Sequence, residues 1–503
     1  MNTYTNADTF APARVQFEHV AHDLAANRGD LFACEQFVAA RLIEIGRLLI
    51  QGTLDLMAAR ESPRDDVRDS SDRPLPYSRP SARTVVSLFG PVQVRRLAYS
   101  ARSGDRYEHP MDEQLGLQRD SFSLNVRARV ARVLLGSSYA EAKDPSLGVL
   151  PFPVCFRSMQ RLTVRMAEDF AAFYAQRSSS SIAPSTHREH TLLILSTDGK
   201  GVPMRTEGLR PATQKAAEQQ EPSAQRYAIK PGQKRQRKRM AQVAAVYSID
   251  PFVRAPEDVL RELRPEDEPF ERVRPRPQNK RVWASVERDA EVEIAAMFDE
   301  AALRDPERKQ RWIVLVDGNE FQLEQVRLNA KRLKADVTIV VDLLHVSGYL
   351  WAAGSALHGA STVAAQLWTD TQVLRLLRGE AREVSRQLRR IATIRKLKGS
   401  KLDAVEAAAR YLSNHAEWLK YDEALTDGLP IATGVIEGAC RYVVKDRMER
   451  TGSRWSLAGA EAILQLRALW ASGDWEAYVQ FHCAREAERA RRPRRDTRED
   501  RAA

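Results

Sequence analysis

The stretch LLILSTDGKGV, residues 192–202, joins a short apolar run to an aspartate flanked by glycines. Leu192 to Leu195 are typical of a buried strand. Asp198 follows, just past the expected end of that strand and before Gly199 and Gly201. An Asp-Gly pair after an apolar run is most often a plain turn. A carboxylate at a strand tip can also carry chemistry, and residues elsewhere in the chain decide between these two interpretations.

The elements downstream of this stretch follow a recognisable order. Apolar runs predict strands at 241–249, 281–286, 311–319 and from 336, with amphipathic helices on either side of the 311–319 strand. Three strands followed by alternating helices and strands are the order of an RNase H-like sheet. We therefore expect an α/β fold whose RNase H-like mixed sheet spans 191–351, is interrupted by an all-helical insertion domain at 352–428, and is completed by 429–483.

A mostly helical region with a β-hairpin precedes this core. Apolar spacing predicts helices in the N-terminal region 1–60, and the polar, Pro-rich segment 61–82 is typical of a linker. The segment 83–175 is expected to hold a β-hairpin around Gly90-Pro91, followed by a helix-turn-helix-like DNA-binding domain. An ordinary three-helix packing remains the alternative. A second linker at 176–190 and a disordered basic tail at 484–503 complete the organisation.

Composition limits the function classes. The chain has 503 residues and a net charge of +11, which favours a polyanionic partner such as double-stranded DNA, although an Arg-rich solvated surface gives the same charge. No apolar run is long enough to span a membrane, no signal peptide is evident, and the four cysteines form no CxxC pair, so we expect a cytoplasmic protein. Phosphate-binding P-loop and GxSxG motifs are also absent.

Two further acidic residues give Asp198 possible partners. Asp317 also ends an apolar strand, and Glu437 lies among apolar neighbours in TGVIEGACRYVVKDRM. Carboxylates on rigid neighbouring elements can hold two Mg²⁺ ions, with Mn²⁺ as a substitute, about 4 Å apart. We therefore predict Asp198, Asp317 and Glu437 as catalytic metal ligands. The alternative for Glu437 is an ion pair with Arg441 at helical spacing.

The stretch VVDLLHVSGYLW adds Asp342 and His345, three residues apart at the start of an expected helix. They could support the metal site from one helix face. The alternative is a helix N-cap at Asp342 and a core histidine. Asp342 also ends an apolar strand, so it competes with Asp317 as the second ligand. We prefer Asp317 because the expected strand order places its strand, the fourth, next to the first.

Basic residues are expected to contact DNA phosphates in three places. Trp455 is expected to stack on a displaced base, the alternative being a core tryptophan. The expected DNA-binding residues are Arg157, Arg161 and Arg165 on the third helix of the N-terminal domain, Lys234, Arg235, Arg237, Lys238 and Arg239 in the run before the second strand, and Arg441, Lys445, Arg447, Arg454 and Trp455 after Glu437.

Several ordered stretches resemble one family. STDGKGVPMR, KRMAQVAAVYSIDPFVR, VLVDGN, VVDLLHVSGYLWAAG and ATGVIEGACRYVVKDRMERTGSRWSLAGAEAILQLRALW are similar to bacterial insertion-sequence transposases of the ISKra type, within the DDE superfamily with an RNase H-like core. FGPVQVRRLAYS and MDEQLGL also resemble that family, so the likeness runs from about residue 83 to 475. It implies that Asp198, Asp317 and Glu437 are the DDE triad and that DLLH, with Asp342 and His345, handles strands or conformation.

The resemblance implies DNA transposition, in which metal-dependent cleavage at the ends of an insertion sequence is followed by strand transfer into target DNA. Bringing two ends together implies at least a homodimer. Two alternatives stay open. One is a catalytically inactive, transposase-derived DNA-binding protein. The other is an RNase H-like structure-selective nuclease, which the long N-terminal region and the helical insertion make less expected.

Overall fold

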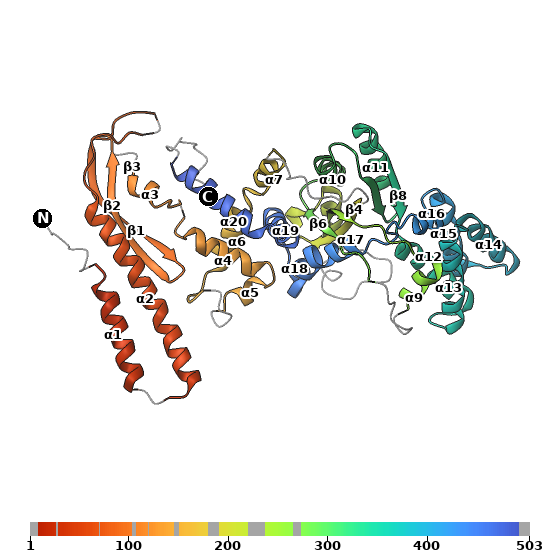
Figure 1. Ribbon diagram of the computed structural model, residues 1–503, viewed down its shortest axis with the longest axis horizontal. Coiled ribbons are helices and arrows are strands. Elements are labelled where there is room, and N and C mark those ends of the chain that lie inside the picture. Colours follow the sequence, from red (N-terminus) through yellow and green to blue (C-terminus); the bar gives the residue numbers. More distant parts are fainter. Residues whose placement is uncertain are drawn as a thin grey trace. The chain divides into compact units, whose positions relative to one another are not determined.

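The computed structural model describes residues 9–26, 29–69, 71–102, 107–118, 120–144, 150–179, 191–219, 237–264 and 273–491. The chain divides into two compact units, Met1–Phe173 with Trp475–Ala503, and Tyr174–Asp474. Each unit contains one sheet together with helices, and the sheet of the second unit is open and mixed (Figure 1). The expected α/β class is therefore confirmed. In the described part of the chain no helix is long and apolar enough to cross a membrane.

Two long helices begin the first unit. They are α1 (Ala11–Ala26) and α2 (Leu31–Arg60), which lie side by side, with α2 packed on the sheet of this unit (Figure 1). Asp30 caps α2 by accepting a hydrogen bond from the amide of Ala33 at 2.8 Å. The helical character expected for the first sixty residues is confirmed over these ranges, because their three- and four-residue apolar spacing matches a helix packed on one side.

A β-hairpin follows, formed by β1 (Tyr77–Ser87) and β2 (Gly90–Ser100) with the short β3 (Tyr107–Glu108) at its edge. Gly90 has φ of +118° at the turn, a conformation that favours glycine. Leu54 of α2 packs with Val85 and Val92 of the hairpin. The strand begins earlier than expected, because the polar residues from Tyr77 onward pair with the second half of β2, and the predicted linker therefore ends before residue 77.

The helices that follow the hairpin include the predicted basic helix. Ser138 caps the helix Tyr139–Ala142 through a capping box with Glu141. Glu168 and Asp169 separate the helix that ends at Ala167 from the helix that begins at Phe170. Thirteen residues separate α5 (Tyr139–Ala142) from α6 (Phe156–Ala167), and 145–149 among them lie outside the described part. A tight helix-turn-helix has a turn of only three or four residues. The elements are α3 (Pro110–Gln114), α4 (Leu124–Leu134), α5 (Tyr139–Ala142), α6 (Phe156–Ala167) and α7 (Phe170–Ser179).

The C-terminal helix α20 (Trp475–Arg491) belongs to this first unit. Its His482 lies 2.7 Å from Asp169, and its Glu486 pairs with the buried Arg127 of α4. Residues 484–491 were expected to begin a disordered tail, and that prediction is wrong. Their charged side chains have buried partners far away in the sequence, which local composition does not reveal. Residues 492–503 of the predicted tail lie outside the described residues.

The second unit is built on a five-stranded sheet with the order β6-β5-β4-β7-β8. β5 runs antiparallel to both β4 and β6, whereas β7 runs parallel to β4 and β8 parallel to β7. The prediction that the fourth strand lies next to the first is therefore confirmed. The strands are β4 (Leu192–Pro203), β5 (Lys238–Ile249), β6 (Gln278–Ser285), β7 (Arg311–Val316) and β8 (Val337–Val341).

Helices cover both faces of this sheet. Phe298 of α10 packs against Trp312 of β7, with 6.4 Å between ring centroids. The alternate residues Ile194 and Ile313 face the other way and join the core formed with the helices after β8. The surrounding short elements and helices are η2 (Thr206–Gly208), α8 (Pro211–Glu218), α9 (Pro256–Glu262), α10 (Ala290–Arg304), α11 (Glu320–Leu333) and α19 (Leu457–Ser472).

The segment between β8 and Glu437 is helical in the structure, as expected. It forms a compact bundle beside the sheet (Figure 1). Its helices are α12 (Leu343–His358), α13 (Val363–Leu377), α14 (Ala381–Ile394), α15 (Gly399–His415) and α16 (Tyr421–Thr426). The chain then returns to the sheet through α17 (Gly434–Ala439), the π-helical turn η4 (Cys440–Lys445), α18 (Asp446–Met448) and the turn η5 (Arg450–Gly452).

Candidate functional site

The register of the three parallel strands aligns three aspartates. Ser196 of β4 pairs with Leu315 of β7, so the same register carried two residues further sets Asp198 level with Asp317. The pairing of Val316 with Val341, carried one residue further, sets Asp342 level with Asp317 on the other side. Alternation along the strands places all three on the face that meets the helical bundle.

Asp198 lies inside a strand and not beyond its end. β4 continues to Pro203, and Asp198 pairs with Val243 of β5, so both the predicted strand end and the plain turn are wrong. The strand passes close to β5 at Gly201, where a Cβ would approach the Lys238 side chain at 2.8 Å. Asp198 nevertheless marks an end, since the pairing of β4 with β7 stops two residues before it.

The carboxylate of Asp198 is mostly buried. It accepts hydrogen bonds from the Gly199 amide at 2.6 Å and from the Cys440 thiol at 3.4 Å. Burial raises the pKa of Asp198, and the nearby Asp317 carboxylate raises it further, while the two hydrogen bonds and the charge of Lys200 lower it. The Asp317 carboxylate on the adjacent strand therefore disfavours the ionised form of Asp198, an effect that a bound cation would relieve.

Asp317 lies in the turn between β7 and α11 and is half-buried. One carboxylate oxygen accepts a hydrogen bond from the Asn319 amide at 2.9 Å, and Asn319 in turn caps α11. Its own backbone carbonyl accepts a hydrogen bond from the Tyr411 hydroxyl at 2.6 Å. The backbone at Asp317 is thus fixed on the side away from its carboxylate.

The Asp342 side chain is buried, and both of its carboxylate oxygens accept hydrogen bonds. Its oxygens accept from the Leu344 amide at 3.0 Å and from the Thr433 hydroxyl at 2.6 Å. The N-cap predicted as the alternative is confirmed. The core histidine predicted with it is wrong, because His345 is exposed, with its ring edge-on to Tyr349 at 5.5 Å between centroids. Asp342 therefore ties the strand end to the loop that leads into α17.

Glu437 projects from α17 toward the same site. Burial raises the pKa of Glu437, and the charges of Asp342 and Asp198 raise it further, whereas His345 lowers it. The predicted ion pair with Arg441 is not observed among the described residues, since Arg441 lies 3.8 Å from Asp446. The π-helical turn that starts at Cys440 changes the spacing behind Glu437, and such turns are frequent at functional sites.

The structure thus brings Asp198, Asp317, Asp342, Glu437 and His345 into one neighbourhood. Within the described ranges, Asp198, Asp317 and Glu437 form no ion pair with Lys or Arg, so their charges lack a direct counter-ion. The oxygen donors fit a hard divalent cation. As they stand, no three His, Cys, Asp or Glu side chains in the described ranges converge closely enough to enclose a metal ion.

The predicted basic residues after Glu437 divide into two groups. Arg441, Lys445 and Arg454 are exposed. Arg447 is buried, with its guanidinium over the Trp455 ring at 4.7 Å, and Trp455 is 4% exposed and donates to the Met448 carbonyl at 3.0 Å. The stacking role expected for Trp455 and the phosphate contact expected for Arg447 are wrong, because both side chains pack inside, and the alternative core tryptophan is confirmed.

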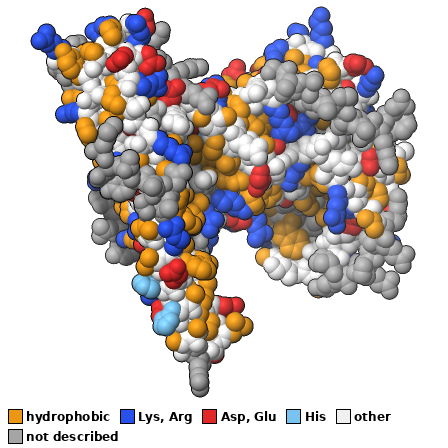
Figure 2. Space-filling view, turned by 60° about the vertical axis from the view of Figure 1, so that its left-hand side comes forward, with side chains coloured by type: hydrophobic (Ala, Val, Ile, Leu, Met, Phe, Trp, Pro, Cys, Tyr) orange, Lys and Arg blue, Asp and Glu red, His pale blue; other side chains and the backbone are white. Residues whose placement is uncertain are grey.

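The run before β5 is only partly described. Lys234 and Arg235 lie outside the described residues, and Arg237 is half-buried. Lys238 pairs with Glu449 at 2.5 Å. Arg239 donates to backbone carbonyls, including that of Val286 at 2.7 Å, so it fixes neighbouring loops and is not held out to solvent. Exposed Lys and Arg side chains occur in separate groups on the face seen in Figure 2.

The predicted basic helix of the first unit is α6. Arg157 and Arg161 are exposed, whereas Arg165 forms an ion pair with Asp120 at 2.8 Å.

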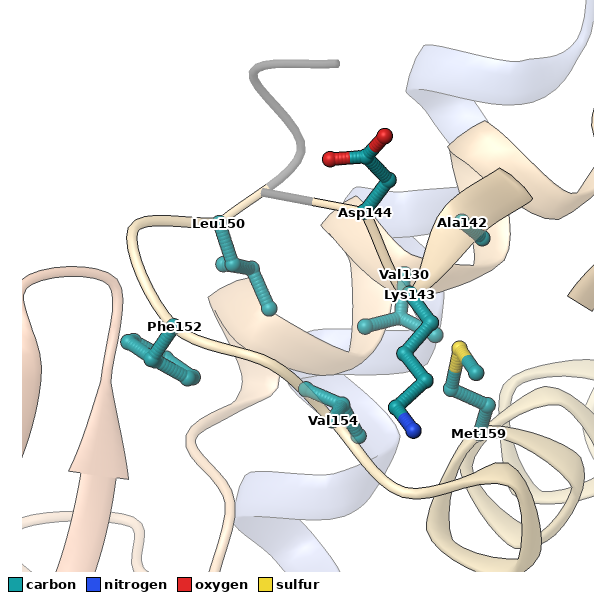
Figure 3. A pocket seen from close by; sticks show the side chains of 8 residues that line it. All are labelled: Val130, Ala142, Lys143, Asp144, Leu150, Phe152, Val154 and Met159. Atoms are coloured by element: carbon teal, nitrogen blue, oxygen red, sulfur yellow. The ribbon is translucent and has the colours of Figure 1, made fainter. Parts of the chain in front are cut away.

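Behind this helix a small pocket lies between α4, α5 and the connection to α6 (Figure 3). It has room for about one water molecule. Its lining residues are Val130, Ala142, Lys143, Asp144, Leu150, Phe152, Val154 and Met159.

Several residues that contact the candidate site lie far along the sequence from the acids they contact, and the sequence did not predict them. Tyr411 and His415 reach the Asp317 turn from α15, Thr433 holds Asp342, and Cys440 holds Asp198. Only Cys440 had a local sequence signal, namely its position three residues after Glu437.

No protein-family model matches the chain, and no curated protein shows significant similarity to it.

Proposed function

We propose that this chain is a DNA transposase of the DDE type. The observation that carries the proposal is the level alignment of Asp198 and Asp317 on adjacent parallel strands, with Glu437 brought to them by a helix. The strand order β6-β5-β4-β7-β8, with β5 antiparallel and a helical bundle before Glu437, supports an RNase H-like core with an insertion domain. The ordered motifs that resemble ISKra-type transposases support the same assignment.

Asp198, Asp317 and Glu437 would hold two Mg²⁺ ions, which Mn²⁺ can replace. Bound there, the ions would supply a nucleophilic oxygen and stabilise the leaving one. Asp317 is favoured over Asp342 as the second ligand because its Oδ2 accepts no hydrogen bond from any described residue, whereas both oxygens of Asp342 accept one. Asp342 keeps α17, and with it Glu437, against the strand ends.

The proposed reaction needs no external energy source. Water attacks a phosphorus at the end of the insertion sequence, the bond to the 3′ oxygen breaks, and that oxygen leaves as a 3′-hydroxyl. The 3′-hydroxyl then attacks a phosphorus of target DNA and releases a target 3′ oxygen, so one phosphodiester replaces another. Arg441, Lys445 and Arg454 follow Glu437 in the sequence, are exposed, and suit phosphates of the bound strand. Arg157 and Arg161 suit recognition of the ends.

Pairing two ends would require at least two copies of the chain, and we propose that the chain acts in the cytoplasm. A cleavage assay tests the function. DNA carrying the sequences that flank the coding region is incubated with Mn²⁺ and the wild type, Asp198→Asn, Asp317→Asn or Glu437→Gln. We expect cleavage only by the wild type and by the matched control Asp336→Asn, which changes an exposed acid at the other end of β8.

DNA binding is measured on the same proteins. Binding without cleavage by the wild type would instead favour an inactive, transposase-derived DNA-binding protein. Cleavage of branched DNA regardless of the flanking sequence would favour a structure-selective nuclease. Normal cleavage by Asp317→Asn together with its loss in an Asp342→Asn variant would overturn the choice of the second ligand.

A further inference from the structure

The backbone on either side of the Asp317 side chain is held by the helical bundle. The Tyr411 hydroxyl donates to the Asp317 carbonyl at 2.6 Å, and His415 Nε2 lies 2.7 Å from the next carbonyl, that of Gly318. Both residues lie one turn apart on α15. Two successive carbonyls of the turn are therefore bound by one helix that follows them by almost a hundred residues.

The fit between the turn and α15 is close. Gly318 has φ of +84°, and a Cβ at this position would meet the Tyr411 hydroxyl and come within 3.1 Å of the His415 ring. On its other side the turn is closed by the bond between the Asn319 amide and the Asp317 carboxylate. Rotation of the Asp317 backbone would break contacts on both sides.

The two α15 side chains are themselves fixed by stacking. The Tyr411 ring stacks on His415 at 4.1 Å and on Tyr349 of α12 at 4.3 Å between centroids. Tyr349 in turn meets His345, the exposed histidine next to Glu437. His415 Nδ1 lies 2.8 Å from the Tyr411 carbonyl of the same helix. A rigid stack therefore links the bundle to the Asp317 turn.

We propose that Tyr411 and His415 are positioning residues that set the Asp317 carboxylate for metal binding, so that the helical bundle controls the metal site. This inference rests on the proposed function, because it acts through Asp317 as a metal ligand. Groups that orient a ligand from behind it commonly change metal affinity by about 10-fold or more when they are removed.

Mn²⁺ binding, followed by electron paramagnetic resonance without DNA, tests the inference. Tyr411→Phe removes one hydroxyl and keeps the stacked ring, and we expect it to weaken Mn²⁺ binding about 10-fold. The matched control is Tyr421→Phe, which removes a buried tyrosine hydroxyl of the same bundle that donates to the Val341 carbonyl at 2.8 Å. We expect this control to leave Mn²⁺ affinity unchanged.

Asp317→Asn separates the two levels of the proposal. If it leaves Mn²⁺ affinity unchanged, the metal site itself is wrong, and both proposals fall. If Asp317→Asn weakens binding while Tyr411→Phe matches the wild type, the positioning role alone falls. Equal losses in Tyr411→Phe and Tyr421→Phe would also overturn it, because the effect would then reflect general loosening of the bundle.

A second pair of variants addresses His415. Gln can keep a donor toward the Gly318 carbonyl, whereas Leu cannot. We expect His415→Gln to bind Mn²⁺ several-fold more tightly than His415→Leu. Equal affinities in these two variants, with each variant folded by circular dichroism, would exclude the hydrogen bond as the positioning contact.

Discussion

Gly318 occupies the tightest point of the candidate site, and replacing it tests how closely α15 holds the Asp317 turn. The residue has φ of +84°, a region that L residues with a Cβ rarely adopt. The added methyl of Gly318→Ala would also displace the Tyr411 hydroxyl from the Asp317 carbonyl. The substitution therefore combines backbone strain with the loss of one buried hydrogen bond.

The size of the effect follows from these two parts. The left-handed conformation costs a residue with a Cβ about 1–2 kcal/mol. A lost intramolecular hydrogen bond costs about 1 kcal/mol. Unfolding of the unit that carries the sheet should therefore become easier by roughly 2–3 kcal/mol. At about 2 °C for each kcal/mol in a unit of this size, its melting temperature falls by roughly 4–6 °C.

Differential scanning calorimetry measures this shift, because it follows the transition of each unit. Gly473→Ala is the matched control, since Gly473 has φ of +78° but a Cβ there would meet nothing within 4 Å. It should show the backbone cost alone, about 1–2 kcal/mol. Equal shifts in the two variants would show that the contact between the Asp317 turn and α15 contributes nothing to stability.

Three further predictions concern Asp198, α6 and Trp455. Burial raises the pKa of Asp198 above its ordinary 3.8, so ionisation of this carboxyl destabilises the folded state above the folded-state pKa. Asp198→Asn should therefore raise the melting temperature at pH 7, and this gain should shrink as pH falls and vanish below about 3.8. An unchanged melting temperature at pH 7 would contradict this prediction. Replacing both Arg157 and Arg161 by Ala should weaken binding to the DNA ends and lower the slope of log affinity against log salt by about 2, whereas Arg389→Ala with Arg390→Ala on α14 should not. Trp455→Ala should lower the free energy of unfolding by about 3–5 kcal/mol in denaturant titration, and unchanged stability with lost DNA affinity would speak for surface stacking instead.

Local patterns were sufficient for the framework of the second unit. Apolar runs such as 311–316 predicted their strands, because burial on both faces requires continuous apolar sequence. The order of strands and helices predicted that β7 lies beside β4, which brings Asp317 level with Asp198. The helical spacing after residue 352 predicted the bundle, since each helix there buries one apolar side.

Features that depend on distant partners could not be predicted in the same way. Asp198 continues a strand because β5 pairs with it far along the chain, although Asp-Gly by itself favours a turn. Trp455 is buried because its backbone pairs with the end of β4, with its amide 3.1 Å from the Pro203 carbonyl. Tyr411 and His415 looked like ordinary helix residues, since their target turn lies almost a hundred residues away.

The proposed function requires that one site both cuts DNA and joins the cut end to a target. The most direct test supplies labelled DNA ends already cut to a 3′-hydroxyl, together with circular target DNA and Mn²⁺, and measures joined product. We predict joining by the wild type, none with ends that lack the 3′-hydroxyl, and none with Glu437→Gln. Hydrolysis of the ends by the wild type without any joined product would rule out a transposase.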